Sequence, residues 1–334
     1  MEQLSTPILV ITDHTGNDED GYVLTAPSKQ LLTLARTLTT GRIDAVALNP
    51  APDMVALGAY GANRVFSPDL SGVSPRVPAI VAECAYAAAQ QDLTYAAVLN
   101  VSNYRGRDVA AGLAMLLDSG AAVDVTDCYV KDGKIQADKS VLAGSWTTVF
   151  TVTRGTPVVS LRPSSVEAVE AEQPTTPEHL QLDVRFSPHA FAVEVLESTP
   201  QKGTGRVSLT EAPVVVCGGR GVDGDFTPVE ELADLLGGAV GATRVACDEE
   251  WIDRTAQIGQ TGVSVAPKLY IGLGVSGAVH HACGIQASEK IVAVVDDPDA
   301  PIVELADFVV IGDLNDVVPA ALDELRAQGI SSTS

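Results

Sequence analysis

The chain has 334 residues, 46% of them hydrophobic, and a formal net charge of −22 at pH 7. This length predicts about two domains of roughly 150 residues each. The acidity argues against nucleic acid or an anionic membrane as a partner. No apolar run approaches the ~20 residues that span a bilayer, and residues 1–7 lack the basic start and apolar stretch of a secretion signal. We therefore expect a cytoplasmic protein without membrane insertion.

The cysteine pattern gives no sign of a disulfide framework or a metal site. None of the five cysteines lies close enough to another to form a CxxC pair. An odd, scattered set is typical of reduced thiols in a core, not of zinc or iron–sulfur ligands. The sequence therefore predicts buried thiols and no metal.

The first ~160 residues alternate short apolar runs with helical stretches. The predicted strands are Ile8–Thr12, Asp44–Leu48 and Tyr95–Asn100, and the predicted helices are Ala26–Leu38, Ile80–Gln91 and Arg107–Leu117. This alternation is typical of parallel βαβ units.

The next part of the chain is richer in strands. A turn at Asp132-Gly133 predicts a hairpin over Tyr129–Ala137. Further predicted strands are Thr147–Thr153, Pro157–Leu161, Leu182–Phe186 and Phe191–Leu196, with an acidic, solvated loop at Glu167–Glu178.

The segment Thr199–Gly205 is short, polar and contains Pro and Gly, so it is the predicted linker. We expect an N-terminal domain at 1–205 and a C-terminal domain at 206–334, both of the α/β class. In the second domain the predicted strands are Val214–Cys217, Val245–Cys247, Lys268–Leu273, Ile291–Val295 and Phe308–Ile311, and the predicted helices are Pro228–Leu236 and Val317–Arg326.

The first candidate motif, Gly218-Gly219-Arg220-Gly221, directly follows an apolar strand. Glycines at the carboxyl end of a strand let the backbone approach a ligand in the crevice where open α/β sheets bind nucleotides. The Arg220 guanidinium offers a planar cation for a ring or an anion. A tight turn with a surface arginine explains the motif equally well.

The second motif, Gly259-Gln260-Thr261-Gly262, brackets two hydrogen-bonding side chains with glycines. This arrangement suits the edge of a heteroaromatic ring. Taken alone, an ordinary polar turn is the simpler interpretation.

The third motif runs from Gly272 through Gly274 to Gly277 and has the spacing G-x-G-x-x-G after a strand, which predicts phosphate at a helix N-terminus. With Asp296 at the end of the next strand, it also fits an NAD(P)-linked oxidoreductase. Three features count against that alternative: a short helix interrupted by a glycine, two adjacent histidines in its first turn, and a position only ~60 residues before the last residue. We expect one histidine of the pair His280 and His281 to face the ligand.

The fourth motif is Asp297-Pro298-Asp299-Ala300-Pro301, followed by Asp313. The prolines fix an extended loop after a strand. Asp313 is a candidate acceptor for adenine or ribose, although loop aspartates are usually caps or solvated charges.

Together these motifs resemble the electron-transfer flavoprotein alpha subunit family over about residues 212–325. The resemblance rests on GGRG, GATR at Gly241–Arg244, GQTG, LYIGLGVSGAVHH, DPDAPI and Ala306-Asp307, in the order and spacing of the family. It implies a C-terminal Rossmann-like FAD-binding domain with a parallel sheet. It also implies an N-terminal domain that contacts a beta subunit carrying AMP or a second flavin.

The resemblance also implies roles for matching residues. Arg220 would lie against the isoalloxazine ring, Thr261 near flavin N5 with Gln260 beside it, and His281 by the C2 carbonyl, where a donor favours the negatively charged reduced flavin. Thr243, Arg244, Ser276 and nearby glycines would hold the diphosphate and ribityl parts, and Asp313 the adenosine end. The complete predicted cofactor-binding set is Arg220, Gly221, Thr243, Arg244, Gln260, Thr261, Gly262, Gly274, Ser276, Gly277, His280, His281, Asp296 and Asp313.

The chain departs from the family pattern at two places. His280 stands where the family usually has Gln, and Val295-Asp296 stands where it usually has Asn-Lys. Loss of a lysine there weakens the neutralisation of the diphosphate by on the order of 4 kcal/mol before desolvation. We therefore expect weaker FAD binding, or a different adenosine position with Asp296 accepting from a ribose hydroxyl.

The predicted function is electron transfer without bond-making chemistry by the chain itself. FAD would accept electrons from dehydrogenases, and the heterodimer with the beta subunit would pass them to an acceptor oxidoreductase. Two alternatives stay open: the NAD(P)-linked oxidoreductase built on Gly272–Gly277 and Asp296, and a non-redox subunit that binds adenine nucleotide.

Overall fold

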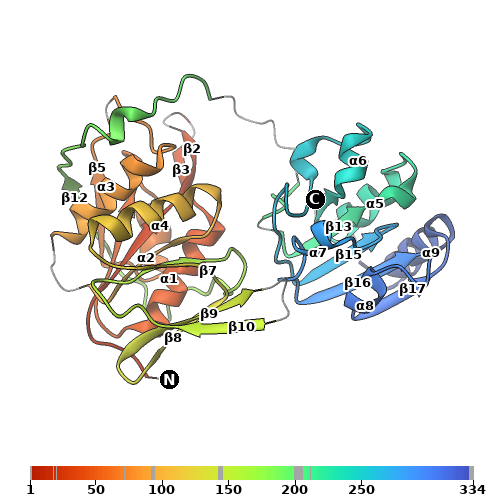
Figure 1. Cartoon of the computed structure of the whole chain (residues 1–334), viewed down its shortest axis with the longest axis horizontal. Helices are drawn as coiled ribbons and strands as arrows, with labels where there is room; N and C mark the ends of the chain where they lie inside the picture. Colours follow the sequence, from red (N-terminus) through yellow and green to blue (C-terminus); the bar gives the residue numbers. More distant parts are fainter. Residues whose placement is uncertain are drawn as a thin grey trace. The chain divides into compact units, whose positions relative to one another are not determined.

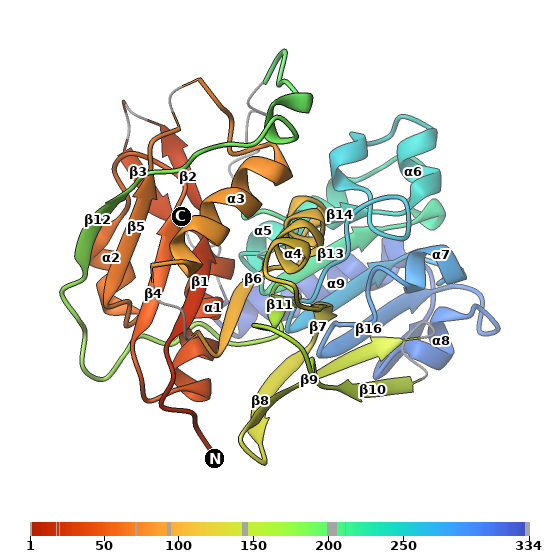
Figure 2. The same ribbon diagram turned by 60° about the vertical axis from the view of Figure 1, so that its left-hand side comes forward.

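A computed structural model describes residues 2–17, 19, 21–70, 72–91, 95–141, 146–198, 206–210 and 212–330. The chain forms two compact units, Met1–Pro200 and Gln201–Ser334, which Figures 1 and 2 show from two directions. The predicted linker Thr199–Gly205 lies outside the described residues. Both units combine helices with a parallel sheet, so the predicted two-domain α/β class is confirmed.

The N-terminal unit is built on a parallel sheet with the strand order β12-β5-β4-β1-β6-β11-β7. Its central strand β1 (Ile8–Thr12) is buried at every position, as a parallel strand covered on both faces requires. The other strands are β4 (Ile43–Ala47), β5 (Arg64–Pro68), β6 (Ala97–Val101), β7 (Ala121–Val125), β11 (Val158–Leu161) and β12 (Glu178–Leu182).

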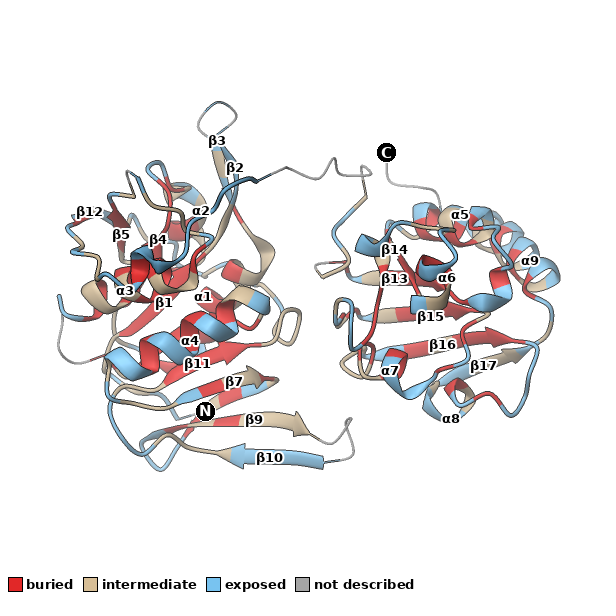
Figure 3. Ribbon diagram, turned by 45° about the horizontal axis from the view of Figure 1, so that its top comes forward, coloured by how far each residue is buried: buried red, intermediate tan, exposed pale blue. Residues whose placement is uncertain are grey.

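Helices cover both faces of this sheet. Side chains of α1 (Ala26–Leu38) and α2 (Met54–Ala59) pack with Ile8 and Val10 of β1. Those of α3 (Pro78–Ala89) and α4 (Tyr104–Leu116) pack with Leu9 and Ile11 on the other face. Figure 3 shows the buried strands between these helices. Each helix buries one stripe because its apolar residues recur at helical spacing.

Two hairpin systems extend the N-terminal unit. One pairs β2 (His14–Asn17) with β3 (Gly21–Leu24), and the other joins β8 (Asp127–Lys131), β9 (Lys134–Val141) and β10 (Trp146–Phe150). The predicted turn is confirmed: Asp132 and Gly133 have φ angles of 51° and 69°. Positive φ at both central residues is the geometry of a tight hairpin turn.

Two strand predictions at the end of this unit are wrong. The strand predicted at Leu182–Phe186 lies earlier, as β12, and ends at Leu182. The segment predicted as Phe191–Leu196 begins with a short 3-10 turn, η1 (Ala190–Ala192), and forms no strand. β12 forms the edge of the sheet beside β5, and the described residues 183–198 that follow it add no further strand.

The C-terminal unit has a parallel sheet with the order β14-β13-β15-β16-β17. One face packs against α5 (Thr227–Leu235) and α9 (Leu314–Ala327). The other face packs against α8 (Ile302–Leu305) and the irregular segment around Ile258 and Val265. The strands are β13 (Val214–Gly218), β14 (Ala239–Ala242), β15 (Leu269–Leu273), β16 (Lys290–Val295) and β17 (Phe308–Ile311).

The strand predicted at Val245–Cys247 is wrong, because these residues belong to helix α6 (Arg244–Asp248). β14 supplies the strand and ends at Ala242, so the chain must turn at Thr243. Ala246 and Cys247 then bury one side of the short helix, while an ion pair joins Arg244 to Asp248 one turn later. The correction places Thr243 and Arg244 at the carboxyl end of β14.

All five cysteines are free thiols and four of them are buried, as predicted; Cys283 is half-buried. Among the described residues, no helix combines the length and the apolar character that crossing a membrane requires.

Candidate functional site

The carboxyl ends of three strands of the C-terminal unit meet at one edge of the sheet. β14 and β15 flank β13, and the chain visits β14 before it returns to β15, so the strand order reverses at β13. The loops after β13 and β15 contact each other directly: the Gly219 amide donates to the Leu273 carbonyl at 2.9 Å and the Gly221 amide to the Gly274 carbonyl at 3.0 Å. Open α/β sheets bind ligands outside such a reversal point.

The glycines of the third motif are packed against protein backbone. A Cβ on Gly274 would lie 2.6 Å from the Gly221 Cα, and one on Gly277 would lie 2.5 Å from the Ile302 amide nitrogen. Both glycines have positive φ, +62° and +76°. They are therefore needed for a close approach between loops, and this weakens the NAD(P) interpretation, in which such glycines make room for a pyrophosphate.

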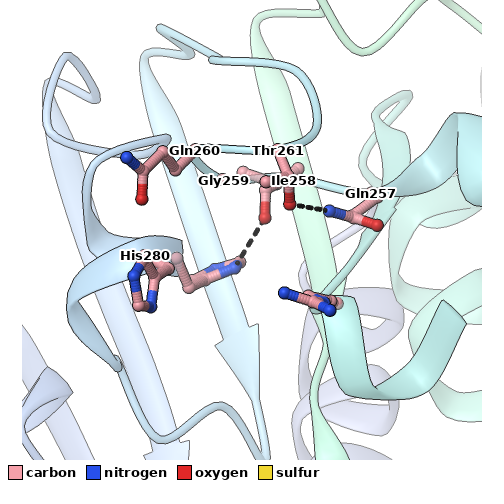
Figure 4. Close-up of a pocket in the computed structure, with 8 residues that line it drawn as sticks. Gln257, Ile258, Gly259, Gln260, Thr261 and His280 are labelled. Carbon is pink, nitrogen blue, oxygen red and sulfur yellow. Dashed lines mark hydrogen bonds between the residues drawn. The ribbon is translucent and has the colours of Figure 1, made fainter. Parts of the chain in front are cut away.

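Two adjoining cavities open at this edge, with volumes of about 410 Å³ and 280 Å³. They share Arg244, His280 and His281. Figure 4 shows the polar side chains around the larger cavity. The larger is also lined by Gln257, Ile258, Gly259, Gln260 and Thr261, and the smaller by Arg220, Thr243, Val245, Ser276, Gly277 and Ala278.

An unpartnered hydroxyl marks the smaller cavity. The Thr243 Oγ1 is buried and has no hydrogen-bond partner among the residues that the structure describes. Thr243 is the N-cap of α6, yet its side chain makes no capping hydrogen bond. Because buried hydroxyls are normally hydrogen-bonded, this atom fits a polar ligand, such as the FAD that these motifs imply.

Arg220 supplies positive charge at the smaller cavity. Residues 206–334 contain 7 Lys and Arg against 20 Asp and Glu. Five of the seven form ion pairs with carboxylates: Arg206, Arg244, Arg254, Lys290 and Arg326. Within the described part of the chain, Arg220 has no such partner, and its side chain is at the cavity. It is therefore available to an anionic or aromatic ligand.

The hydroxyl of Thr261 is oriented by a buried amide. The Gln257 Nε2 donates to the Thr261 Oγ1 at 2.8 Å, and Gln257 is 4% exposed. Because this hydroxyl oxygen accepts from Gln257, its own proton is free to be donated into the cavity (Figure 4). Gln260 lies beside it with an exposed side chain, and its backbone amide donates to the His280 carbonyl at 2.8 Å.

The two histidines occupy different environments. His280 is exposed and lines both cavities. His281 is 6% exposed, its Nδ1 lies 3.1 Å from the Ile258 carbonyl oxygen, and its Nε2 lies 2.7 Å from the Tyr270 hydroxyl. Because a carbonyl only accepts, Nδ1 carries the proton and Nε2 accepts from Tyr270.

This arrangement leaves His281 without a free donor. Burial lowers the pKa of His281 from 6.5 to about 4, so the ring is neutral at pH 7. Its predicted donation to a flavin carbonyl stays a prediction, and it requires the ring to give up Tyr270 or Ile258. His280 is the histidine presented to the cavities.

We expect His281 to make the stability of the C-terminal unit depend on pH. Between pH 6.5 and pH 4 the unfolded chain binds a proton that the native ring does not, so stability falls as the pH falls through that window. The full loss is about 3 kcal/mol. Hydrogen exchange of the β15 amides at several pH values measures this loss of unfolding free energy. In His281→Gln this part of the pH dependence should vanish; an unchanged pH dependence would show that His281 is not buried as a neutral ring.

Five predicted residues line neither cavity. Gly221 and Gly274 pack against each other, and a Cβ on Gly262 would lie 2.1 Å from the Gln257 carbonyl oxygen. Asp296 is exposed after β16, and Asp313 caps α9 by accepting from the Asn315 amide at 2.8 Å. Their contacts to a cofactor stay predictions.

Two residues to which the sequence analysis assigns no role also shape the site. Gln257 lies two residues before the second motif, and Tyr270 lies inside β15. Tyr270 is completely buried, which raises the pKa of its hydroxyl well above the ordinary value and keeps it protonated as a donor. Gln257 lies outside the quoted motifs and Tyr270 lies inside LYIGLGVSGAVHH, but only their contacts in the fold show their roles.

Comparison with known proteins agrees with this geometry. The family model of the electron transfer flavoprotein FAD-binding domain matches residues 208–286, and that of the electron transfer flavoprotein domain matches residues 13–185. The chain is 37% identical to electron transfer flavoprotein subunit alpha of Mycobacterium leprae over 326 residues, covering 96% of this chain and 98% of that protein. The subunit alpha of Mycobacterium tuberculosis H37Rv is 36% identical over 330 residues, with the same coverage of 96% and 98%.

The subunit alpha of Bacillus subtilis is 36% identical over 229 residues, which cover 68% of this chain and 70% of that protein. The matches therefore include both units of the chain, and the FAD-binding match includes every residue that lines the two cavities. The chain belongs to the electron transfer flavoprotein alpha subunit family, and its C-terminal unit contains the segment that matches the FAD-binding domain of that family.

Proposed function

We propose that the chain is the FAD-holding subunit of a two-subunit electron carrier, which takes electrons from dehydrogenases and delivers them to an acceptor oxidoreductase. The observation that carries this proposal is that the residues around the two cavities all lie within the FAD-binding match. The segment that matches the FAD-binding domain, 208–286, supplies all the side chains around the two adjoining cavities. Bound FAD supplies reversible electron transfer; the chain supplies binding and electrostatics.

Three groups of the chain support contact with the isoalloxazine ring. The Arg220 guanidinium provides an unpaired cation, the Thr261 hydroxyl a fixed donor, and the His280 ring an exposed donor or acceptor. A cation and donors near the ring stabilise negative charge that develops there on reduction. We assign the buried Thr243 hydroxyl, together with Ser276 and Arg244, to the polar chain that joins the ring to the nucleotide.

The adenosine end of the proposed site offers less positive charge to FAD than the flavin-ring end. Asp296 is exposed at the end of β16 in the position where the family usually has lysine. Asp313 already holds the first turn of α9 through its carboxylate. We propose that FAD is held chiefly through its ring and diphosphate.

The N-terminal unit is the proposed contact surface for a beta subunit in a cytoplasmic heterodimer. Its segment 191–196 carries apolar side chains that are exposed in this chain: Phe191 at 60%, Val193 at 60% and Leu196 at 88%. Apolar side chains that lie close together on a surface support a protein interface. The names of the matched relatives, which are alpha subunits, support a second subunit.

A visible absorption spectrum of the full chain, purified with its partner subunit, tests the proposed function. We expect the two visible bands of an oxidised flavin, and we expect them to bleach on reduction by dithionite and to return in air. A colourless protein that reduces NAD(P) with a substrate would favour the oxidoreductase alternative. A colourless protein that binds adenine nucleotide without redox activity would favour the non-redox alternative.

A further inference from the structure

A third cavity, of about 340 Å³, lies in the N-terminal unit. Residues that follow β1, β4 and β6 line it, among them His14, Asn49 and Tyr104. β4 and β6 are the two neighbours of β1, and the chain passes through β4 before it returns to β6. The cavity therefore lies outside the point where the strand order of this second sheet reverses, which is where open α/β sheets bind ligands.

His14 lies at this cavity with no hydrogen-bond partner for its ring. Both ring nitrogens, Nδ1 and Nε2, are buried and unpartnered among the described residues. Burial lowers the pKa of His14, and the nearby carboxylates of Asp53 and Asp13 oppose this only in part. A neutral imidazole offers one donor and one acceptor. Since buried polar atoms are normally paired, these two nitrogens fit a polar ligand in the cavity.

The charge at the cavity favours an anion, although the whole chain is strongly acidic. Its lining contains Arg76 and Arg105 against one carboxylate, Asp13. Arg105 is already engaged, since it pairs with Asp13 and donates to the Pro75 carbonyl at 2.9 Å. Arg76 is exposed, and within the described ranges its side chain has no partner. Among the described residues that line the cavity, Arg76 is thus a cation without a carboxylate partner; Asp53, which is not in the lining, acts on His14.

The N-terminus of α4 adds to this positive potential. The helix has 13 residues and begins at Tyr104, whose side chain also lines the cavity. Its N-cap Asn103 accepts from the Gly106 amide at 2.7 Å, so the cap satisfies the third amide of the helix. The first two amides belong to Tyr104 and Arg105, which both line the cavity. The positive end of a helix dipole together with an arginine is a common phosphate-binding arrangement.

We propose that this cavity of the N-terminal unit binds a small phosphomonoester, with the phosphate at Arg76 and the N-terminus of α4 and with His14 hydrogen-bonded to the same molecule. The cavity is larger than a phosphate group alone. The ring of Tyr104, 81% exposed, offers a surface on which the remainder of the ligand can stack. This site shares no residue with the two flavin cavities, so the proposal does not depend on the proposed function.

Calorimetric titration of the full chain tests this site. The chain is purified with its partner subunit and saturated with FAD, so that the C-terminal site is filled. The probes are a nucleoside 5′-monophosphate, inorganic phosphate and the nucleoside without phosphate. We expect the monophosphate to bind, inorganic phosphate to compete with it, and the nucleoside to bind at least about tenfold more weakly.

Matched variants locate the binding. Arg76→Gln should weaken the monophosphate about tenfold, because it removes one charge-assisted contact. Arg107→Gln removes the same charge from an exposed position on α4 outside the cavity lining and should leave the affinity unchanged. His14→Asn should weaken binding, whereas His189→Asn, at an exposed histidine of the same unit, should not.

Because Arg76 is exposed, Arg76→Gln should fold normally, and an unchanged flavin spectrum checks this. Equal affinities in Arg76→Gln and Arg107→Gln would overturn the proposal, even if the monophosphate bound elsewhere in the assembly. Failure of the monophosphate to bind, or equal binding of the nucleoside, would overturn it as well. None of these results would affect the flavin assignment, which the spectrum tests separately.

Discussion

Replacement of Arg220 by alanine should weaken FAD binding about 10- to 100-fold, since a charge-assisted contact contributes about 1.5–3 kcal/mol. Among the described residues of the C-terminal unit, Arg220 is the cation at the cavities that has no carboxylate partner. The other arginine at this cavity, Arg244, is already paired with Asp248 and therefore does not replace the lost charge. Where FAD is retained, its midpoint potential should fall by about 30–60 mV, because reduction adds negative charge beside the missing cation.

Equilibrium dialysis of FAD and a spectroelectrochemical titration measure the two effects. Arg326→Ala is the matched control: it removes the same charge from an exposed position on α9 that lines neither cavity. If Arg220→Ala and Arg326→Ala bound FAD equally and had equal potentials, the role proposed for Arg220 would be wrong.

The central strands of both sheets can be predicted from the sequence because they are continuous apolar runs. The central strand β1 of the first sheet has the predicted bounds, and the central strand β15 of the second begins one residue after its predicted start and ends where predicted. A strand that is buried on both faces has no polar positions to alternate with, so its limits coincide with the limits of the apolar run.

The short helix α6 could not be predicted in the same way. Val245 and Cys247 favour a strand by composition, yet the preceding strand β14 already ends at Ala242. Packing of Ala246 and Cys247 in the core therefore overrides the local preference. The misplacement matters for function because α6 positions Arg244 at both cavities.

The sequence motifs locate the site but not its internal hydrogen bonds. Arg220, Thr261 and His280 lie in loops whose glycines are visible in the sequence, and the structure gathers them around adjoining cavities. Tyr270 and Gln257 are different, because their roles depend on contacts with His281 and Thr261 that no local pattern encodes. The most consequential result is the neutral, fully hydrogen-bonded His281, which residue type alone does not predict.

Replacement of Gly219 by alanine should disrupt both the stability of the C-terminal unit and its cofactor site. The backbone of Gly219 is extended, with φ −104° and ψ −163°, so alanine is allowed there by its own conformation. The obstacle is space: a Cβ would lie 2.1 Å from the Gly274 carbonyl oxygen and 2.7 Å from the Val275 Cα. Both atoms belong to the backbone, which cannot relieve the clash by a change of rotamer as a side chain can.

The two loops must therefore separate. Separation breaks the hydrogen bonds from Gly219 to Leu273 and from Gly221 to Gly274. Two lost hydrogen bonds at about 1 kcal/mol each, together with overpacking at about 1–3 kcal/mol, give an expected destabilisation of about 3–5 kcal/mol. The same movement displaces Arg220 within the cavity that it lines, so FAD binding should be lost together with stability.

Thermal unfolding of the C-terminal unit and flavin content measure this pair of effects, with Gly312→Ala as the control. A Cβ on Gly312 would meet only a methyl group of Val317, at 3.3 Å, and that side chain is able to shift. We expect Gly312→Ala to stay within about 1 kcal/mol of the parent chain and to keep its flavin. If Gly219→Ala behaved like Gly312→Ala in both measurements, the loops after β13 and β15 would not be in the close backbone contact on which the site depends.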